Sequence, residues 1–283
     1  MMHAFVLAGG AARGAYGAGV MRYIFTELPK NLGWTPWPDL VSGTSVGALN
    51  GVFAACHNEE AIHYISDLWR NLSIEHVYRL RAFRAMGSLV WALRSTEPFF
   101  MLDARPLRHL VDNAFPNLAF RTSIDSGLCK AFYISATDLA SGFNTLFVDT
   151  KDKGRLNVGG PNIHVASVKV KTGHCLASAA LPLLFQPVEV DGRLYVDGGL
   201  RQNTPIRPVI RSGARHILVV SGRRAPNTQA PPTERQAVPN LMYLAGKSLN
   251  ALLLDPVERD LVHVEQFNQL LALGVNSAGA PFL

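Results

Sequence analysis

The first fifth of the chain alternates between short apolar runs and longer stretches with helical spacing. Residues 4–8 are a continuous apolar run, which is typical of a buried parallel strand. Residues 15–28 predict a helix, which we expect to end at Pro29. A second apolar run, beginning at Leu40, leads through a sharp turn into a helix over 45–55. This order of strand, loop and helix predicts the βαβ units of an α/β fold.

The rest of the chain continues the pattern of strands and helices. Strands are predicted over 131–137, 143–148, 194–196 and 217–221, and helices over 61–72, 174–180, 241–254 and 257–273. The last of these strands reads as buried.

Two stretches depart from this regular pattern. Residues 77–101 are apolar on most sides of a helical wheel and contain several arginines. Packing in the core and a role as an acyl-chain wall or membrane-facing cap both remain open for them. Residues 223–240 are rich in Pro and Gln and predict a mobile linker. We therefore expect a catalytic domain over 1–222, a linker over 223–240, and C-terminal helices over 241–283 that pack on the same domain.

Composition narrows the class of protein. With 283 residues, 48% hydrophobic and 17% charged, the chain can bury a large core. The net charge is +6, from 27 Lys and Arg against 21 Asp and Glu. This excess is modest and spread out, so we expect no nucleic-acid partner, although a membrane surface stays open. Three cysteines without metal-ligand spacing indicate buried thiols in a reducing compartment.

Targeting signals are not evident. No run of 18 apolar residues occurs, and the apolar run near the N-terminus is too short for a signal peptide. We expect a cytoplasmic protein, with peripheral membrane contact left open, and we expect neither a metal nor another cofactor. The oligomeric state does not follow from the sequence.

The turn at Gly43-Thr44-Ser45-Val46-Gly47 fits the G-x-S-x-G pattern of a nucleophile elbow. The pattern places Ser45 on a tight strand-to-helix turn, at a helix N-terminus that favours negative charge. Gly43 and Gly47 remove side chains that would collide across such a turn. The motif is short, and an ordinary helix N-cap is the alternative interpretation of Ser45.

A second glycine-rich loop follows the first predicted strand. Gly9-Gly10-Ala11-Ala12-Arg13-Gly14 lacks the Gly-Lys-Ser/Thr of a phosphate-binding P-loop, and Ala11 breaks the dinucleotide fingerprint. What remains is a run of small residues whose backbone N–H groups suit an anion such as an oxyanion. Arg13 either contacts an anionic substrate or pins the loop to a carboxylate, and we favour pinning.

Asp197 is the carboxylate best placed to serve Ser45. It ends a predicted strand, and Gly198 and Gly199 after it allow a close approach to another loop. An Asx-turn that closes a hairpin is the alternative. Asp138 is expected to cap a turn.

A histidine triad fits the sequence less well than a Ser–Asp dyad. His216 comes just before the last predicted strand, and His263 lies inside a helical pattern. The elbow follows only one βα unit, whereas ordinary α/β-hydrolases need several strands before it. The sequence therefore favours Ser45 paired with Asp197.

Taken together, these motifs resemble the patatin-like phospholipase family. The glycine-rich loop is similar to the family's oxyanion loop, and Gly43 to Gly47 match its elbow. Ala177 to Pro182 resemble the small-residue helix that precedes the family's aspartate, and Asp197-Gly198-Gly199, followed by Asn203-Thr204-Pro205, matches its aspartate motif. The likeness covers about residues 4–222. One departure is Ala11, where the family usually has a third glycine.

The resemblance implies a three-layer α/β/α fold with a mostly parallel central sheet and an early nucleophile elbow. It also implies a serine lipid acyl hydrolase of the phospholipase A or lysophospholipase type, with a lipid or phospholipid substrate. Ser45 and Asp197 would be catalytic, and the loop Gly9 to Gly14 with Val46 would bind the oxyanion. A soluble carboxylesterase or thioesterase with the same dyad is an alternative, as is a non-catalytic module that binds lipid or another anion.

Overall fold

The computed structural model describes residues 2–80 and 100–222. The strands are β1 (His3–Leu7), β2 (Leu40–Thr44), β3 (Arg79–Leu80), β4 (Leu102–Asp103), β5 (Ala131–Asp138), β6 (Asn144–Thr150), β7 (Ile163–Ser167), β8 (Val188–Val190), β9 (Arg193–Asp197) and β10 (His216–Val220). The α-helices are α1 (Gly14–Arg22), α2 (Pro29–Leu32), α3 (Val46–Ala55), α4 (Glu59–Arg70), α5 (Ile74–Val77), α7 (Arg105–Ala114), α8 (Asn117–Ser126), α9 (Thr172–Ser178) and α10 (Ile206–Arg211). Shorter helical turns are η1 (Ala11–Arg13), η2 (Tyr23–Glu27), η3 (Lys153–Leu156) and η4 (Gly198–Leu200).

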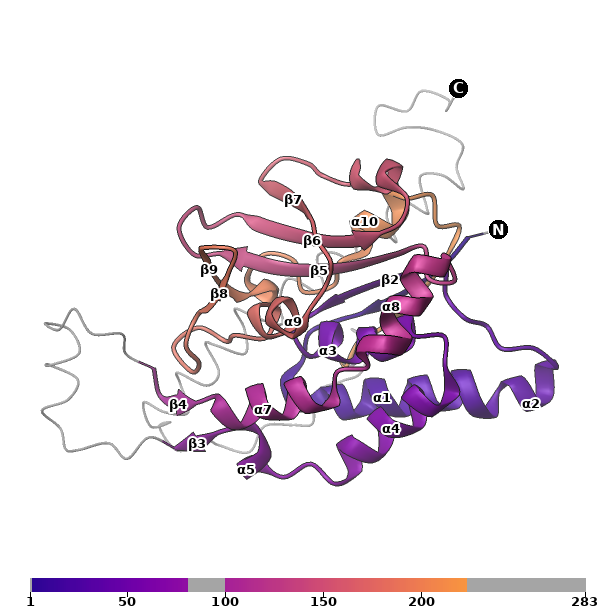
Figure 1. Ribbon diagram of the computed structural model, residues 1–283, viewed down its shortest axis with the longest axis horizontal. Helices are drawn as coiled ribbons and strands as arrows, with labels where there is room; N and C mark the ends of the chain where they lie inside the picture. The colour runs from indigo at the N-terminus through magenta and orange to yellow at the C-terminus, as the bar shows by residue number, and fades with distance from the viewer. Residues whose placement is uncertain (1, 81–99, 223–283) are drawn as a thin grey trace, which may run out of the picture.

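Eight of these strands form one central sheet (Figure 1). Its order is β10-β1-β2-β5-β6-β7, and the hairpin of β8 and β9 joins it through β5. The strands β10, β1, β2 and β5 are parallel. The pair β6 and β7 is parallel within itself but runs antiparallel to β5. The sheet is therefore mostly parallel, and its first four strands share one carboxyl edge.

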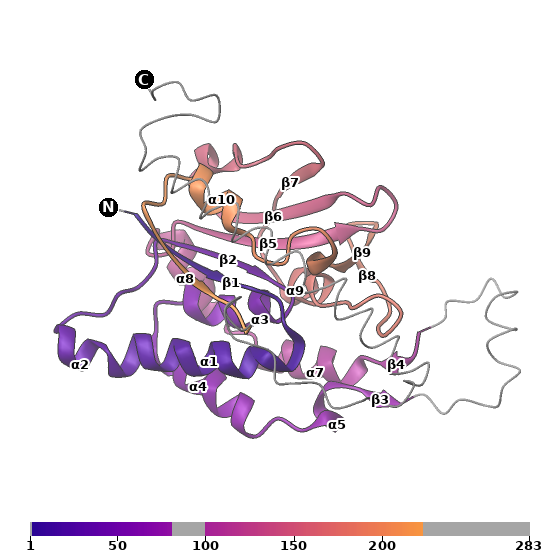
Figure 2. The same ribbon diagram turned by 180° about the vertical axis from the view of Figure 1, so that it is seen from behind.

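The two faces of the sheet pack against separate hydrophobic cores. Side chains such as Phe5 and Phe132 face a large core shared with α1, α3, α4, α8 and α9. Their neighbours along the same strands, such as Ala4 and Tyr133, face a smaller core that includes Ile206 of α10. Alternation along each strand thus supplies two apolar faces, and helices cover both (Figures 1 and 2). The predicted three-layer α/β/α fold is confirmed.

Pro29 does not end the first helix as predicted. The chain continues from α1 through the π-helical turn η2 and then starts α2 at Pro29 itself. Proline suits this first helical position because its missing N–H group would have no intrahelical partner there. The element ends instead at Gly33, which adopts a left-handed φ of 74°.

The strand β10 is not buried as its apolar sequence predicts. Among the described residues β10 pairs only with β1 and forms an edge of the sheet, and Leu218 is 48% exposed. An apolar run alone does not distinguish a central strand from an edge strand, because hydrogen-bond partners come from elsewhere in the chain.

Several interpretations concern residues outside the described ranges. They are the linker over 223–240, the helices over 241–283 and the central part of the segment 77–101. The residues that flank this last segment form the antiparallel pair of β3 and β4. None of the described helices combines the length and apolar character needed to cross a membrane.

Candidate active site

Ser45 lies at a strained turn between β2 and α3. Its φ of 56° and ψ of −128° are unusual for a residue with a side chain. The turn needs glycines on both sides of Ser45. A Cβ added to Gly47 would lie 2.1 Å from the carbonyl oxygen of Leu7, and a Cβ added to Gly43 would lie 2.5 Å from the carbonyl oxygen of Gly47. The G-x-S-x-G pattern therefore forms a nucleophile elbow.

The Ser45 side chain does not act as a helix cap. Although Ser45 occupies the N-cap position of α3, its hydroxyl accepts no hydrogen bond from the first turn of that helix. Its backbone N–H donates instead to Oγ of Ser178 at 2.8 Å. The N-cap alternative is therefore wrong for the side chain, whose hydroxyl stays available for another partner.

The register of the sheet brings Ser45 and Asp197 together. Along β5, Ser135 pairs with Thr44 of β2 and the next residue, Ala136, pairs with Asp197 of β9. The opposite edge of β5 is occupied by β6 along its length, so β2 and β9 share one edge. These two strands run toward each other and end at adjacent positions. The residue after Thr44 therefore meets the carboxyl-terminal residue of β9.

Asp197 is a buried carboxyl group with one oxygen left unpaired. It is 1% exposed, and its Oδ1 accepts a hydrogen bond of 2.7 Å from the N–H of Gly199. This is the Asx-type contact that the alternative predicted. Oδ2 has no hydrogen-bond partner of ordinary geometry among the described residues. One oxygen thus holds the turn, and the other accepts no hydrogen bond of ordinary geometry, although the carboxyl group is near enough to the Ser45 hydroxyl to interact with it.

Burial sets the protonation behaviour of Asp197. Loss of hydration raises the pKa of its carboxyl group from an ordinary 3.8 to about 6. Interactions with the Ser45 hydroxyl and the Gly199 N–H oppose this rise but are smaller. Asp197 is therefore near its midpoint of ionisation slightly below neutral pH, which is where a general base works well.

Gly198 allows Asp197 to sit this deep. A Cβ on Gly198 would lie 2.1 Å from the carbonyl oxygen of Ser135 in β5. The backbone after Asp197 therefore passes directly against β5, as the predicted close approach of this loop requires. The same side of the site is held by Ser178, whose hydroxyl donates to the Ser135 carbonyl at 2.6 Å.

The glycine-rich loop lies over the elbow. A Cβ built on Gly9 would come within 3.3 Å of the Cβ of Ser45, and one on Gly14 within 2.2 Å of the Val46 side chain. The N–H groups of Gly10 and Val46 make no hydrogen bond within the described part of the chain. Two candidate anion donors thus flank Ser45, one from the loop and one from the first turn of α3.

Two asparagines fix this loop: Asn203, which belongs to the predicted aspartate motif, and Asn50, which the sequence analysis did not single out. Asn203, 2% exposed, accepts the Gly9 N–H through its backbone at 3.1 Å and donates to the Gly9 carbonyl through Nδ2 at 3.4 Å. Asn50, 1% exposed, donates to the Gly14 carbonyl at 2.9 Å and accepts from Trp69 Nε1. The sequence could have indicated the role of Asn50, because an amide side chain inside the apolar sequence of α3 needs a buried hydrogen-bond partner.

Among the described residues, Arg13 does not meet the carboxylate partner that we favoured. Within residues 2–80 and 100–222 it forms no ion pair with a carboxylate. Its aliphatic stem packs against the backbone of Gly222, where an added Cβ would lie 2.8 Å from the Cβ of Arg13. Packing, rather than a salt bridge with a described residue, therefore orients this side chain.

Ala11 occupies a left-handed backbone conformation, with φ of 48°. The departure from glycine at this position therefore carries strain. We predict that Ala11→Gly raises the free energy of unfolding by about 0.5 to 1 kcal/mol. The matched control is Ala12→Gly, because Ala12 lies in η1 without a positive φ and should be destabilised by a similar amount. Urea unfolding of the three proteins measures both, and shifts of the same sign would contradict the strain at Ala11.

Other candidates lie elsewhere or have structural roles. The Asp138 carboxylate accepts hydrogen bonds from the N–H and hydroxyl of Ser141, which confirms the predicted turn cap, and it also pairs with Arg193. His216 stacks on His3 at 5.2 Å between ring centroids, at the amino edge of the sheet. The described residues contain no group of three or more potential metal-ligating side chains.

The remaining sequence candidates are placed as follows. The three cysteines are free and buried, as predicted. His263 lies outside the described residues.

Comparison with known proteins gives the class of the chain. Residues 5–210 match the patatin-like phospholipase family, so the chain belongs to this family. Its curated relatives include the lysophospholipase NTE1 of two strains of Cryptococcus neoformans var. neoformans serotype D, each 30% identical over 115 residues. The match covers 40% of this chain but only 7% of those relatives. Among solved structures, VipD from Legionella pneumophila aligns with 77% of this chain and 49% of its own, at 16% identity and a TM-score of 0.44.

Proposed function

We propose that this protein is a serine lipid acyl hydrolase that cleaves fatty-acyl esters through a dyad of Ser45 and Asp197. The observation that carries the proposal is the register of β5, at which the ends of β2 and β9 meet. Membership of the patatin-like phospholipase family supports a lipid substrate of the phospholipase A or lysophospholipase type.

In the first step, the Ser45 hydroxyl attacks the ester carbonyl while Asp197 accepts its proton through the unpaired Oδ2. A new bond forms between Ser45 Oγ and the carbonyl carbon, and the negative charge moves to the carbonyl oxygen. Collapse of this intermediate breaks the bond to the leaving alcohol, which takes the proton from Asp197. Water then attacks the acyl-enzyme, with Asp197 again acting as base, and releases the fatty acid and free Ser45.

The backbone supplies the oxyanion hole in this proposal. The N–H groups of Gly10 and Ala11 from the glycine-rich loop, with that of Val46 at the start of α3, would hold the negative oxygen. Val46 also benefits from the helix dipole of α3. Removing a single oxyanion donor commonly lowers the rate by a factor of about 100 to 1000. The Ser45 N–H is not a donor here, because it is bound to Ser178.

Two alternatives differ in testable ways. A soluble carboxylesterase or thioesterase with the same dyad would act as fast on monomeric esters as on micellar ones, whereas a lipid hydrolase gains rate above the micelle concentration. A non-catalytic anion-binding module would bind lipid without turnover, and the strain at Ala11 is the one observation in its favour.

Fluorophosphonate labelling tests the nucleophile. We expect stoichiometric labelling of the wild-type protein and none of Ser45→Ala, because only an activated serine attacks the reagent. Ser126→Ala is the matched control, since Ser126 is an exposed serine at the end of α8. The readout is the mass of the intact protein after labelling. Label retained on Ser45→Ala at the wild-type rate would remove Ser45 from the mechanism.

A further inference from the structure

Three large apolar side chains are exposed beside the proposed active site. Leu139, Phe143 and Leu194 are 49%, 47% and 47% exposed. The backbone joins them: the N–H of Leu139 donates to the carbonyl of Leu194, and the N–H of Asp138 donates to that of Phe143. The turn between β5 and β6 therefore lies beside the tip of the β8–β9 hairpin, and both carry exposed apolar side chains. We call these three residues the apolar rim.

The apolar rim stands beyond the site in the direction in which β5 runs. Leu194 precedes Asp197 by three residues on an extended strand, which corresponds to about 10 Å. The turn that holds Leu139 and Phe143 is level with it, because Asp138 pairs with Tyr195. Figure 1 shows β8 and β9 at this end of the sheet. A flat surface that touched the rim would therefore lie about 10 Å from Asp197 along β9.

Arginines that have no acidic partner among the described residues adjoin the rim. The guanidinium group of Arg201 lies next to Gly142, in the turn between β5 and β6, because a Cβ added there would be 3.3 Å from its Nη2. The guanidinium group of Arg207 lies next to Gly160, where an added Cβ would be 2.9 Å from its Nη1. Gly160 contacts the start of β7, which is level with the start of β6. Within the described part of the chain, neither arginine forms an ion pair.

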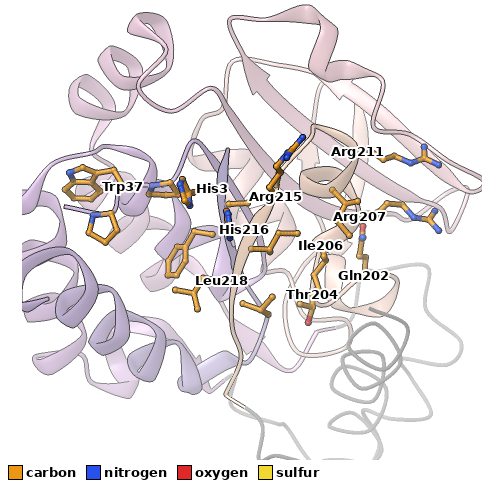
Figure 3. Close-up of a pocket in the computed structure, with 18 of the residues that line it drawn as sticks. His3, Trp37, Gln202, Thr204, Ile206, Arg207, Arg211, Arg215, His216 and Leu218 are labelled. Atoms are coloured by element: carbon orange, nitrogen blue, oxygen red, sulfur yellow. The ribbon is translucent and has the colours of Figure 1, made fainter. Parts of the chain in front are cut away.

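The groove next to the rim is also positively charged. It encloses about 1510 Å³, is lined by Phe143, Arg201, Arg207 and Arg211 among others, and has no described Asp or Glu in its lining. The side chains of Arg207 and Arg211 extend in the same direction from α10 (Figure 3). Like charges held side by side repel each other, so an anion between them would be stabilised.

We propose that the apolar rim and the adjoining arginines form the surface that docks the protein on a bilayer with anionic headgroups. Leucine and phenylalanine side chains on protruding turns enter the interface between headgroups and acyl chains, and guanidinium groups pair with lipid phosphates. The link to catalysis rests on the proposed function, since docking there would present the site to its substrate. Binding itself is measurable without catalysis.

The test measures sedimentation of the full chain with vesicles. The Ser45→Ala protein, which should not hydrolyse the lipid, is mixed with phosphatidylcholine vesicles that contain or lack phosphatidylglycerol. We expect Leu139→Ser with Leu194→Ser to lower the partition coefficient at least tenfold on the anionic vesicles. We expect Arg201→Gln with Arg207→Gln to remove the preference for phosphatidylglycerol and its sensitivity to salt.

Matched controls lie outside the rim and the groove. Leu128 is 56% exposed and precedes β5, whereas Leu139 follows it. Lys30 is an exposed lysine of α2 that does not line the groove. Leu128→Ser and Lys30→Gln should bind like the parent protein. Equal losses in rim and control variants, or no binding of the parent to anionic vesicles, would overturn the proposal. So would a rim variant that changes the sedimentation of the lipid-free protein, which would make the rim an interface between copies.

A second measurement separates docking from the proposed function. With Ser45 intact, the rim variants should hydrolyse a short monomeric ester at the wild-type rate and lose rate only on vesicles. Vesicle binding that depends on the rim, in a wild-type protein that hydrolyses no ester, would sustain docking and refute the hydrolase. Monomeric and vesicle substrates slowed to the same extent would refute the docking surface alone.

Discussion

Asp197→Asn is expected to lower kcat by a factor of about 10³ to 10⁴ and, at the same time, to raise the stability of the fold. An amide cannot accept the proton of Ser45, so the attack on the ester loses its base. The buried charge that the amide replaces is costly, because its carboxyl group is 1% exposed and its Oδ2 has no described partner. Initial rates on a monomeric ester, with calorimetric unfolding of the same samples, measure both effects.

Asp138→Asn is the matched control for this substitution. Asp138 is also a buried aspartate at the end of a neighbouring strand, but hydrogen bonds from Ser141 and pairing with Arg193 lower the pKa of its carboxyl group. Removing its charge should therefore destabilise the fold and leave hydrolysis near the wild-type rate. The two aspartates thus predict opposite pairs of results. A stable Asp197→Asn protein with wild-type turnover would exclude the dyad.

The pH dependence follows from the direction of the Asp197 shift. The folded-state pKa is raised from 3.8 to about 6, so the native state binds this proton more tightly than the unfolded chain does. The protonated carboxyl group of Asp197 therefore stabilises the fold below pH 4. This stabilisation amounts to roughly 3 kcal/mol and is lost as the pH rises to 6. Turnover should rise over the upper part of that range, as the base ionises. The stability difference between Asp197→Asn and wild type should widen over the whole range.

The parts of the site that depend on local sequence could be predicted from the chain alone. Gly43 and Gly47 have no side chain to collide across a tight turn at Ser45, and the structure has that turn. Asp197 was found because a strand followed by two glycines is also a local pattern. Each motif is a local pattern, so its recognition required no knowledge of distant contacts.

The contacts that fix the site could not be predicted in the same way. Ser178 lies 133 positions from Ser45 in the sequence, and Asn203 lies 194 positions from Gly9, so neither pairing leaves a local signal. The helices α8 and α10 and the strands β7 and β8 were not predicted either. Short or partly exposed elements such as β7 and β8 carry little periodicity, and their place in the sheet comes from pairing with distant strands.

Strain at the elbow links these distant contacts to catalysis. Ser45 holds a positive φ because its N–H is bound by Ser178, its preceding strand is paired with β5, and its helix packs beneath β1. The Ser45 hydroxyl does not cap its own helix, and in the proposed mechanism it is therefore available to Asp197. The close contact between α3 and β1 at Gly47 should therefore be the most sensitive point of the scaffold.

Gly47→Ala is expected to lower kcat by a factor of about 100 or more and to destabilise the fold by about 1 to 3 kcal/mol. The added Cβ would lie 2.1 Å from the Leu7 carbonyl oxygen and 2.8 Å from that of Ala8, and both obstacles are backbone atoms that cannot rotate away. Either α3 or the end of β1 must move, and with it the Ser45 hydroxyl or the loop at Gly9.

Gly19→Ala provides the contrast, because it adds the same methyl group to a helix where nothing lies within 4 Å. This substitution should stabilise the protein by about 0.5 to 1 kcal/mol through the better helix propensity of alanine, with turnover unchanged. Urea unfolding and initial rates on a monomeric ester test both variants. Since the two changes are chemically identical, a loss of rate confined to Gly47→Ala assigns it to the position of the elbow against β1. Equal behaviour of the two variants would mean that the elbow tolerates a shift of its helix and that its strain is not needed for catalysis.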